Sequence, residues 1–249
     1  MTLRLARNKK RNLKLSLAYR LAKLLPMNSD KKLKFFLDLS WIFARLAHEE
    51  TFRSTVYIGG NTLNTFLLDG VPQSASLLDI GCGKGYIMKQ LQTKTNNILG
   101  VDYNKEDIDY LAQHLPHPDI KVICDDIFHY MAQLEGVYFD VIVLSHVIEH
   151  IDEPEPFLAK LVNMAKTFYI EVPDFESNYQ NAYREKLGTD LVYSDADHVS
   201  EFRRNDLEKM FKELDLQVLG SEFRGSVMKY WLASKKNFEG RTNWKDVKK

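Results

Sequence analysis

Short apolar runs alternate with amphipathic helical stretches from residue 76 to the end of the main domain. The runs that predict strands are 76–80, 97–102, 120–124, 139–144 and 167–172, followed by 216–223 and 227–234 around the turn Arg224-Gly225-Ser226. Strands that alternate with helices form a parallel sheet with both faces covered. We therefore expect an α/β fold with a doubly wound, mostly parallel, seven-stranded sheet.

The first 55 residues have a different pattern, that of a helical N-terminal extension. Residues 13–25 place five leucines on one helical stripe, and Pro26 ends this segment. A second helix is expected to open at Ser29, a suitable N-cap residue. The favoured interpretation is that both helices pack on the main body and help close its active site. The alternative is a basic surface for an anionic lipid, a nucleic acid or a glycan.

These patterns divide the 249 residues into three parts. Residues 1–55 form the basic helical extension, residues 56–235 the main domain, and residues 236–249 a polar C-terminal tail. Within the main domain, the polar stretch 173–200 is an insertion that we expect on the side of the acceptor. The length suits one large α/β domain with an extension.

Net charge is zero, but the charges are unevenly distributed. Residues 1–34 hold eleven Lys or Arg and one acid, Asp30, which leaves 23 basic and 33 acidic residues in the rest of the chain. The extension therefore carries about ten positive charges and the body ten negative ones, which makes contact of residues 1–34 with an anionic surface an open possibility. We expect no membrane span and no signal peptide, and the two cysteines predict free thiols and a cytoplasmic location.

The segment SLLDIGCGKG at 76–85 is the strongest candidate for a ligand site. A buried strand ends in a turn with glycine at 81, 83 and 85, where main chain can approach a ligand closely. Tyr86 stands where the dinucleotide fingerprint needs a small residue, and Lys84-Gly85 does not complete a P-loop. The acid Asp79 before the turn suits a cationic ligand and would repel a pyrophosphate.

LLDIGCGKG resembles motif I of the class I S-adenosylmethionine (SAM)-dependent methyltransferases, and three later segments match the family in order. In ILGVDYN, Asp102 ends the second strand; VICDDIF follows the third strand, and FDVIVLSHVIEHIDEP covers the fourth strand and its loop. The resemblance spans roughly residues 50–235 and implies SAM as the cofactor. It further implies that Asp102 accepts the ribose hydroxyls and that Asp126, or else Asp125, meets the adenine amine. The implied cofactor-binding residues are Asp79, Gly81, Cys82, Gly83, Gly85, Asp102, Tyr103, Asp125, Asp126, Ile127 and Ser145.

The loop after the fourth strand carries the candidate catalytic residues His146 and His150. A histidine is well matched to removing a proton from a hydroxyl or amine acceptor near neutral pH. His198 is a third candidate. H-x-x-E-H also occurs in zinc proteases, but that motif needs a helix, whereas this one follows a strand. The loop is closer to that of quinone-pathway O-methyltransferases, which hold a metal with E-x-x-E-H. His146 replaces the first glutamate here, so we expect no metal.

The acceptor is less constrained than the cofactor. No N-P-P-Y tetrapeptide of N-methylating enzymes is present, and the corresponding element is EVPDFE at 171–176. We therefore expect methyl transfer to an oxygen of a small-molecule or glycan-like acceptor, with no obligatory protein partner. Two alternatives stay open: a SAM-binding scaffold without turnover, and a methyltransferase attached to a membrane or nucleic acid through the basic extension.

Overall fold

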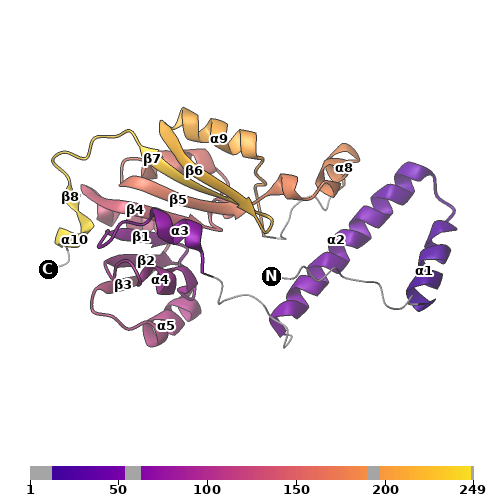
Figure 1. The fold of residues 1–249 in the computed structure, drawn as a ribbon, viewed down its shortest axis with the longest axis horizontal. Coiled ribbons are helices and arrows are strands. Elements are labelled where there is room, and N and C mark those ends of the chain that lie inside the picture. Colours follow the sequence, from indigo (N-terminus) through magenta and orange to yellow (C-terminus); the bar gives the residue numbers. More distant parts are fainter. Residues whose placement is uncertain (1–12, 54–62, 190–196, 248–249) are drawn as a thin grey trace, which may run out of the picture.

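The computed structural model describes residues 13–53, 63–189 and 197–247, and one twisted sheet forms its centre (Figure 1). Seven strands lie in the order β3-β2-β1-β4-β5-β7-β6. Their bounds are β1 Leu77–Ile80, β2 Ile98–Asp102, β3 Ile120–Cys124, β4 Val137–Ser145, β5 Ala165–Pro173, β6 Leu216–Arg224 and β7 Val227–Ser234. Strands β1 to β5 are parallel, and β7 is antiparallel to both of its neighbours. The expected α/β sheet is confirmed.

Helices cover both faces of the sheet, as the alternation of side chains along the central strands requires. In β4, Val141 and Val143 join one hydrophobic cluster, while Ile142 and Leu144 join another on the opposite face. The first cluster includes α3 (Thr65–Gly70), α4 (Tyr86–Leu91) and α5 (Lys105–His114). The second includes α6 (Ile127–Tyr130), α7 (Pro154–Leu161) and α9 (Arg204–Glu213). The sheet is thus the middle layer of three.

The helical extension consists of α1 (Leu13–Lys23) and α2 (Ser29–Arg53). Helix α2 contacts α8 (Gln180–Lys186), where the Arg184 guanidinium donates to the backbone oxygen of Leu37 at 3.3 Å. Helix α1 lies beyond α2, at the end of the molecule farthest from the sheet (Figure 1). Leu17 and Leu21 of α1, and Leu24 directly after it, are exposed, so the expected packing of α1 on the body is wrong. In the described part of the chain, no helix is long and apolar enough to span a membrane.

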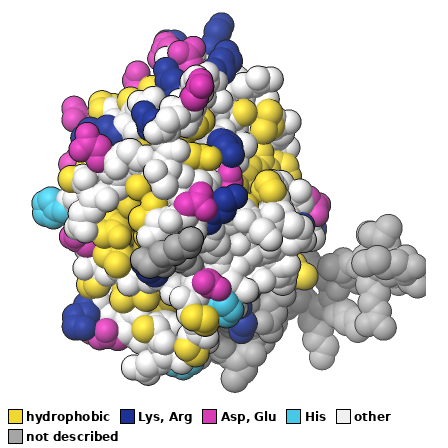
Figure 2. Space-filling view, turned by 90° about the vertical axis from the view of Figure 1, so that its left-hand side faces the viewer, with side chains coloured by type: hydrophobic (Ala, Val, Ile, Leu, Met, Phe, Trp, Pro, Cys, Tyr) yellow, Lys and Arg dark blue, Asp and Glu magenta, His cyan; other side chains and the backbone are white. Residues whose placement is uncertain are grey.

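Two segments contain more regular structure than their polar sequences suggest. The 173–200 stretch includes the short helix η3 (Phe175–Ser177) as well as α8. In the C-terminal segment, β8 (Thr242–Asn243) pairs in parallel with the start of β4, and α10 (Trp244–Val247) follows. Trp244 is 5% exposed, and its ring centroid lies 5.7 Å from that of Phe139. On the face of the molecule at this end, basic and acidic side chains are interspersed (Figure 2).

Candidate active site

The turn between β1 and α4 is shaped by glycines that no other residue could replace without strain. Gly81 and Gly85 have φ angles of 70° and 76°, in the left-handed region. A Cβ atom on Gly81 would come within 2.8 Å of a Val147 methyl carbon, and one on Gly85 within 2.2 Å of a Leu111 methyl carbon. The turn therefore packs directly against the loop after β4 on one side and against α5 on the other.

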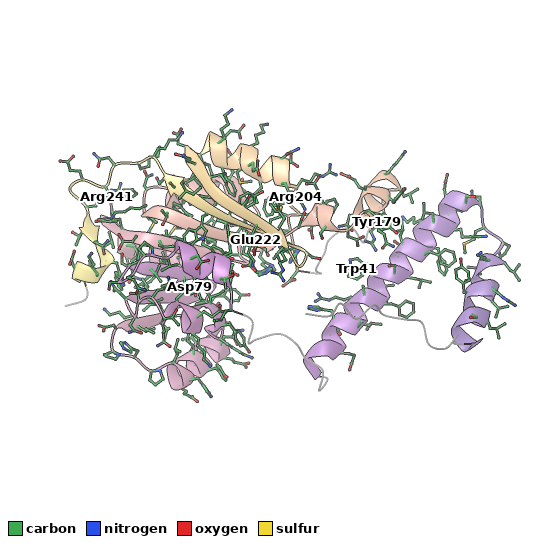
Figure 3. The ribbon with its side chains drawn as sticks, viewed as in Figure 1. Trp41, Asp79, Tyr179, Arg204, Glu222 and Arg241 are labelled. Atoms are coloured by element: carbon green, nitrogen blue, oxygen red, sulfur yellow. The ribbon has the colours of Figure 1, made fainter. Side chains whose placement is uncertain are left out.

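Asp79 lies beneath this turn, in the middle of the sheet (Figure 3), and only 1% of it is exposed. Its Oδ2 atom is buried and has no hydrogen-bond partner. Burial, together with the nearby charge of Asp102, raises the pKa of Asp79 to about 8. A buried carboxyl with an orphaned oxygen gains most from a ligand that brings a positive charge or a donor. Asp79 therefore fits a cationic cofactor group at the glycine turn.

Asp102 ends β2 next to the turn, as expected from the sequence. Its Oδ2 accepts from the backbone N–H of Gly83 at 2.8 Å, and its Oδ1 accepts from that of Asn104 at 2.8 Å. Cys82, between these elements, packs its sulfur against Gly100, where an added Cβ would lie 2.9 Å from it. Burial raises the pKa of the Cys82 thiol, which makes it a packing group and a poor nucleophile.

The remaining cofactor candidates follow β2 and β3, whose carboxyl ends are paired at Asp102 and Cys124. Tyr103 is 82% exposed at this edge, and Ile127 is buried at the start of α6. Asp126 is the N-cap of α6 and accepts from the Phe128 N–H, while Asp125 accepts from the N–H of Asp126 itself. Both acids thus shape the backbone here.

His146 is clamped between two carboxylates at the carboxyl ends of β4 and β5. Its Nδ1 lies 3.1 Å from Glu149 Oε1, and its Nε2 lies 3.6 Å from Glu171 Oε1. Glu171 is opposite Ser145, the last residue of β4, in the register of the two strands. Burial of the ring lowers the pKa of His146, but the hydrogen bonds and charges of the two glutamates outweigh it and raise this pKa to about 9. His146 therefore carries a proton at neutral pH.

Glu171 links His146 to a wider polar network that the sequence did not predict. The hydroxyl of Tyr169 donates to Glu171 Oε2, and the amide of Asn64 donates to the same oxygen at 3.1 Å. Burial raises the pKa of Glu171, but hydrogen bonds from His146 and Tyr169 and the charges of His146 and Lys229 lower it below its usual value. Asn64 precedes α3 and caps it through the N–H of Leu67. The strand at 167–172 was predicted, but Glu171 was noted only as part of the EVPDFE element at 171–176.

The other two candidate histidines lie together on the far side of Glu149. The ring centroids of His150 and His198 are 4.9 Å apart, edge to face. His150 Nδ1 lies 3.1 Å from the backbone oxygen of Asp197, and His198 Nδ1 lies 3.1 Å from Glu201 Oε1. The backbone N–H groups of residues 199 and 200 donate to the backbone carbonyl oxygen of Glu149, at 2.9 and 3.1 Å. The end of the 173–200 insertion thereby holds the 146–150 loop in place.

Glu149, His150 and His198 bring one ligand atom each to within 4.8 Å of one another. Oε2 of Glu149 is buried and lacks a hydrogen-bond partner. One carboxylate and two imidazoles suit a transition metal or zinc better than magnesium, which prefers oxygen ligands. The group differs from the set considered in the sequence, since His198 takes the place of His146.

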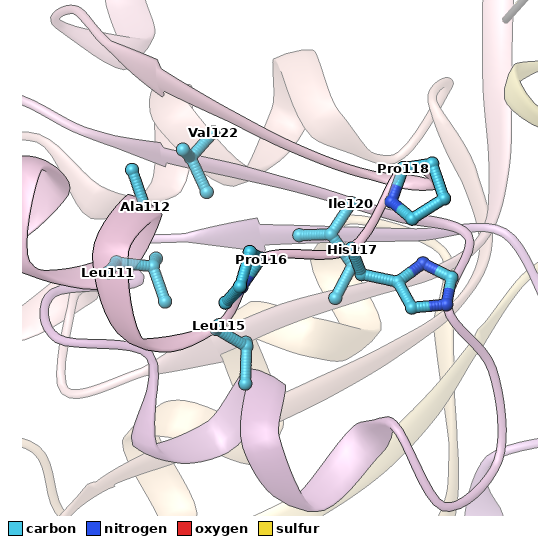
Figure 4. Close-up of a pocket in the computed structure, with 8 residues that line it drawn as sticks. All are labelled: Leu111, Ala112, Leu115, Pro116, His117, Pro118, Ile120 and Val122. Carbon is cyan, nitrogen blue, oxygen red and sulfur yellow. The ribbon is translucent and has the colours of Figure 1, made fainter.

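Two hollows bear on where an acceptor could bind. One, of about 320 Å³, lies between α2, α8 and the segment after β5, and its lining includes Trp41, Arg45, Pro173 and Asn181. Trp41 is on the side of α2 that faces the body (Figure 3). Another, of about 450 Å³, is apolar and lies between α5 and the amino end of β3 (Figure 4). The second is at the wrong end of the sheet, because ligands of open α/β sheets bind at the carboxyl ends of the strands.

Solved structures of methyltransferases share this fold. One chain from the complex between the Haloferax volcanii Trm112 methyltransferase activator and a methyltransferase aligns with a TM-score of 0.56. The identity is 13%, and the alignment covers 70% of this chain and 89% of that one. The magnesium protoporphyrin IX methyltransferase of Synechocystis, solved with bound SAH, aligns with a TM-score of 0.51 at 15% identity, over 70% and 80%. At these identities the likeness concerns the fold alone.

Comparison of sequences identifies the family of this chain. Ubiquinone biosynthesis O-methyltransferase of Hahella chejuensis is 24% identical over 138 residues, which are 52% of this chain and 58% of that protein. Its counterpart from Actinobacillus pleuropneumoniae is 22% identical over 196 residues, or 68% and 81%. The match to the first relative thus spans little more than half of that relative's length. A family profile described as a methyltransferase domain matches residues 50–220, more than half of the chain. With the glycine turn and the sheet order in place, this chain belongs to the class I SAM-dependent methyltransferases.

Proposed function

We propose that this methyltransferase transfers the methyl group of SAM to an oxygen atom of a small-molecule or glycan-like acceptor. The observation that carries the proposal is the clamp on His146, because a hydroxyl acceptor must lose a proton, and the neutral form of a histidine held by two carboxylates is a strong base for it. The names of the relatives, ubiquinone biosynthesis O-methyltransferases, favour oxygen over nitrogen. The two free cysteines support the cytoplasm as the compartment.

For the cofactor, the proposed roles follow the chemistry of each side chain. Bound SAM supplies a methyl group already activated on a positive sulfur. Asp79 offers its orphaned oxygen to the cationic part of this molecule, and Asp102 offers two acceptor oxygens to ribose. Tyr103, with Asp125, Asp126 and Ile127, borders the adenine. Ser145, at the end of β4, lies beside the methionine moiety.

His146 is the proposed catalytic residue, and His150 is the second candidate for this role. The side chain of His146 is 46% exposed, so its ring can contact an acceptor while Glu149 and Glu171 fix the orientation of the ring. Its raised pKa means that the neutral ring, once formed, is a stronger base than an ordinary histidine. The acceptor proton moves to a ring nitrogen, and the fraction of neutral His146 sets the rate.

The hollow beside Trp41 is the proposed acceptor pocket. Its wall includes Pro173, which lies two residues beyond Glu171 on the same side of β5, and Glu171 in turn contacts His146. A volume of about 320 Å³ is at the small end of ligand sites, and a tryptophan offers a flat apolar wall. This pocket favours a compact acceptor with a ring.

The test supplies labelled SAM and a metabolite extract, and mass spectrometry identifies the methylated product and the methylated atom. We expect an O-methyl product that is lost with His146→Asn and strongly reduced with Trp41→Ala. The matched control is His117→Asn, since His117 lines the apolar hollow at the other end of the sheet. An N- or C-methyl product would contradict the proposal. SAM binding without any product would favour the scaffold alternative.

A further inference from the structure

Helix α1 presents a row of leucines to solvent. Leu17 and Leu21, four residues apart on one side of α1, are 59% and 58% exposed, and Leu24, in the turn directly after the helix, is 77% exposed. We call this row the leucine stripe. Next to it, in the turn that leads to α2, Met27 is 39% exposed. Single exposed apolar residues are ordinary, but an aligned row on a helix indicates a surface that something covers.

Basic side chains flank the leucine stripe. Arg20 and Lys23 are exposed on α1, and Lys31 is exposed at the start of α2. The Lys23 ammonium lies 4.7 Å from the centroid of the Tyr19 ring. The first 34 residues together hold eleven Lys or Arg and one acid. A helix with an apolar row bordered by lysine and arginine is typical of one that lies in the interface of an anionic membrane.

Three kinds of partner could cover such a surface, and the charges distinguish them. A second copy of the chain would bring two strongly basic extensions together, and these repel each other. A nucleic acid would satisfy the lysines and arginines but would leave the leucines in water. An anionic bilayer offers phosphates to the basic groups and acyl chains to the leucines. Of the three, only the bilayer complements both properties.

The charge of the body specifies the orientation of binding. Residues 35–249 carry 23 basic and 33 acidic residues, so an anionic surface repels the body and attracts the extension. Helix α1 also lies at the end of the molecule farthest from the sheet (Figure 1), which leaves the leucine stripe accessible. We propose that α1 and the turn after it bind the surface of a bilayer that contains anionic lipids, with the leucine stripe among the acyl chains. This inference is independent of the acceptor.

The experiment uses the whole protein and vesicles of phosphatidylcholine alone or with phosphatidylglycerol. We expect co-sedimentation with the anionic vesicles, which weakens as salt rises, and little binding to neutral ones. The double variant Leu21→Gln/Leu24→Gln should reduce partitioning roughly tenfold, because it removes apolar contacts with the acyl chains. The control is Leu219→Gln on β6, since Leu219 is 56% exposed but lies outside the extension. Unchanged SAM affinity and melting temperature show that the variants are folded.

Three results would overturn the proposal. The first is equal binding, or no binding, to both kinds of vesicle. The second is a concentration-dependent dimer that the double variant at Leu21 and Leu24 abolishes, which would assign the leucine stripe to a second copy. The third is salt-sensitive binding to a DNA or RNA duplex that persists in the double variant, together with no binding to either kind of vesicle. That result would assign the extension to a nucleic acid.

Discussion

Replacing Glu171 with glutamine tests whether two carboxylates hold the proton on His146. Two unit charges 3.6 Å apart interact by about 1 kcal/mol in water and about four times as much at the effective dielectric of a protein surface. Since about 1.4 kcal/mol corresponds to one pKa unit, the Glu171→Gln change should lower the pKa of His146 by about 1 to 3. The ring is half exposed, so we expect the lower end of that range.

NMR titration of the His146 ring in the ligand-free protein measures this directly and needs no acceptor. Wild-type His146 should titrate near pH 9, and Glu149→Gln should lower its pKa as well, because Glu149 is closer and buried. The control is Glu135→Gln, an exposed acid before β4. If wild-type His146 titrates at its ordinary value, or if Glu171→Gln leaves its pKa unchanged, the clamp does not exist in solution.

The same shift has a consequence for stability, whose sign follows from the direction of the shift. The folded pKa of His146 lies above its unfolded value of 6.5, so protonation stabilises the fold fully below that pH. This contribution is lost as the pH rises through about 9. Urea unfolding at pH 6 and pH 10 should therefore show a loss that is smaller in Glu171→Gln than in the wild type.

Further outcomes are expected at other positions. Asp102→Ala should weaken SAM binding, measured by calorimetry, about ten- to a hundredfold. Asp102→Asn should lose less affinity, because it keeps one acceptor for the Gly83 N–H. Equal affinity in the wild type and both variants would refute the ribose assignment. Gly85→Ala should lower the melting temperature by several degrees, since its Cβ would collide with Leu111 at 2.2 Å; an unchanged value would show that the turn relaxes freely. Chelation should leave turnover intact, because the proposed base, His146, needs no metal. Loss of activity that added manganese or zinc restores would establish a metal site at Glu149, His150 and His198.

The glycine turn and the elements around it were predictable, because each of them is a short continuous segment of the chain. The strand, the glycine turn and Asp102 have a local pattern, and the structure places them together as expected. The second carboxylate partner of His146, Glu171, had no local signal. Glu171 meets His146 only because β4 and β5 pair in a register that puts Ser145 opposite Glu171. Asn64 joins them from a segment more than 100 residues away.

The ends of the strands and the surroundings of the extension also depend on contacts that local sequence does not predict. β4 begins at Val137, two residues before the predicted start, because the first two residues pair with β8 from the distant C-terminal segment. The leucines of α1 have the period of a packed helix, and periodicity alone does not say whether protein or another medium covers them. Local pattern predicted the elements, while pairing across the sequence decided their partners.

The backbone of His146 imposes a conflict between robustness and catalysis. Its φ angle of 56° lies in the left-handed region, which glycine adopts freely and asparagine tolerates better than most residues. A mutant library screened only for heat resistance above pH 9, where the charge of His146 no longer stabilises the fold, should therefore enrich glycine or asparagine at position 146. A library screened for product should retain histidine and accept the backbone cost of about 1 kcal/mol or more. Deep mutational scanning under the two regimes would give opposite preferences at this one position, which would mark His146 as a functional residue.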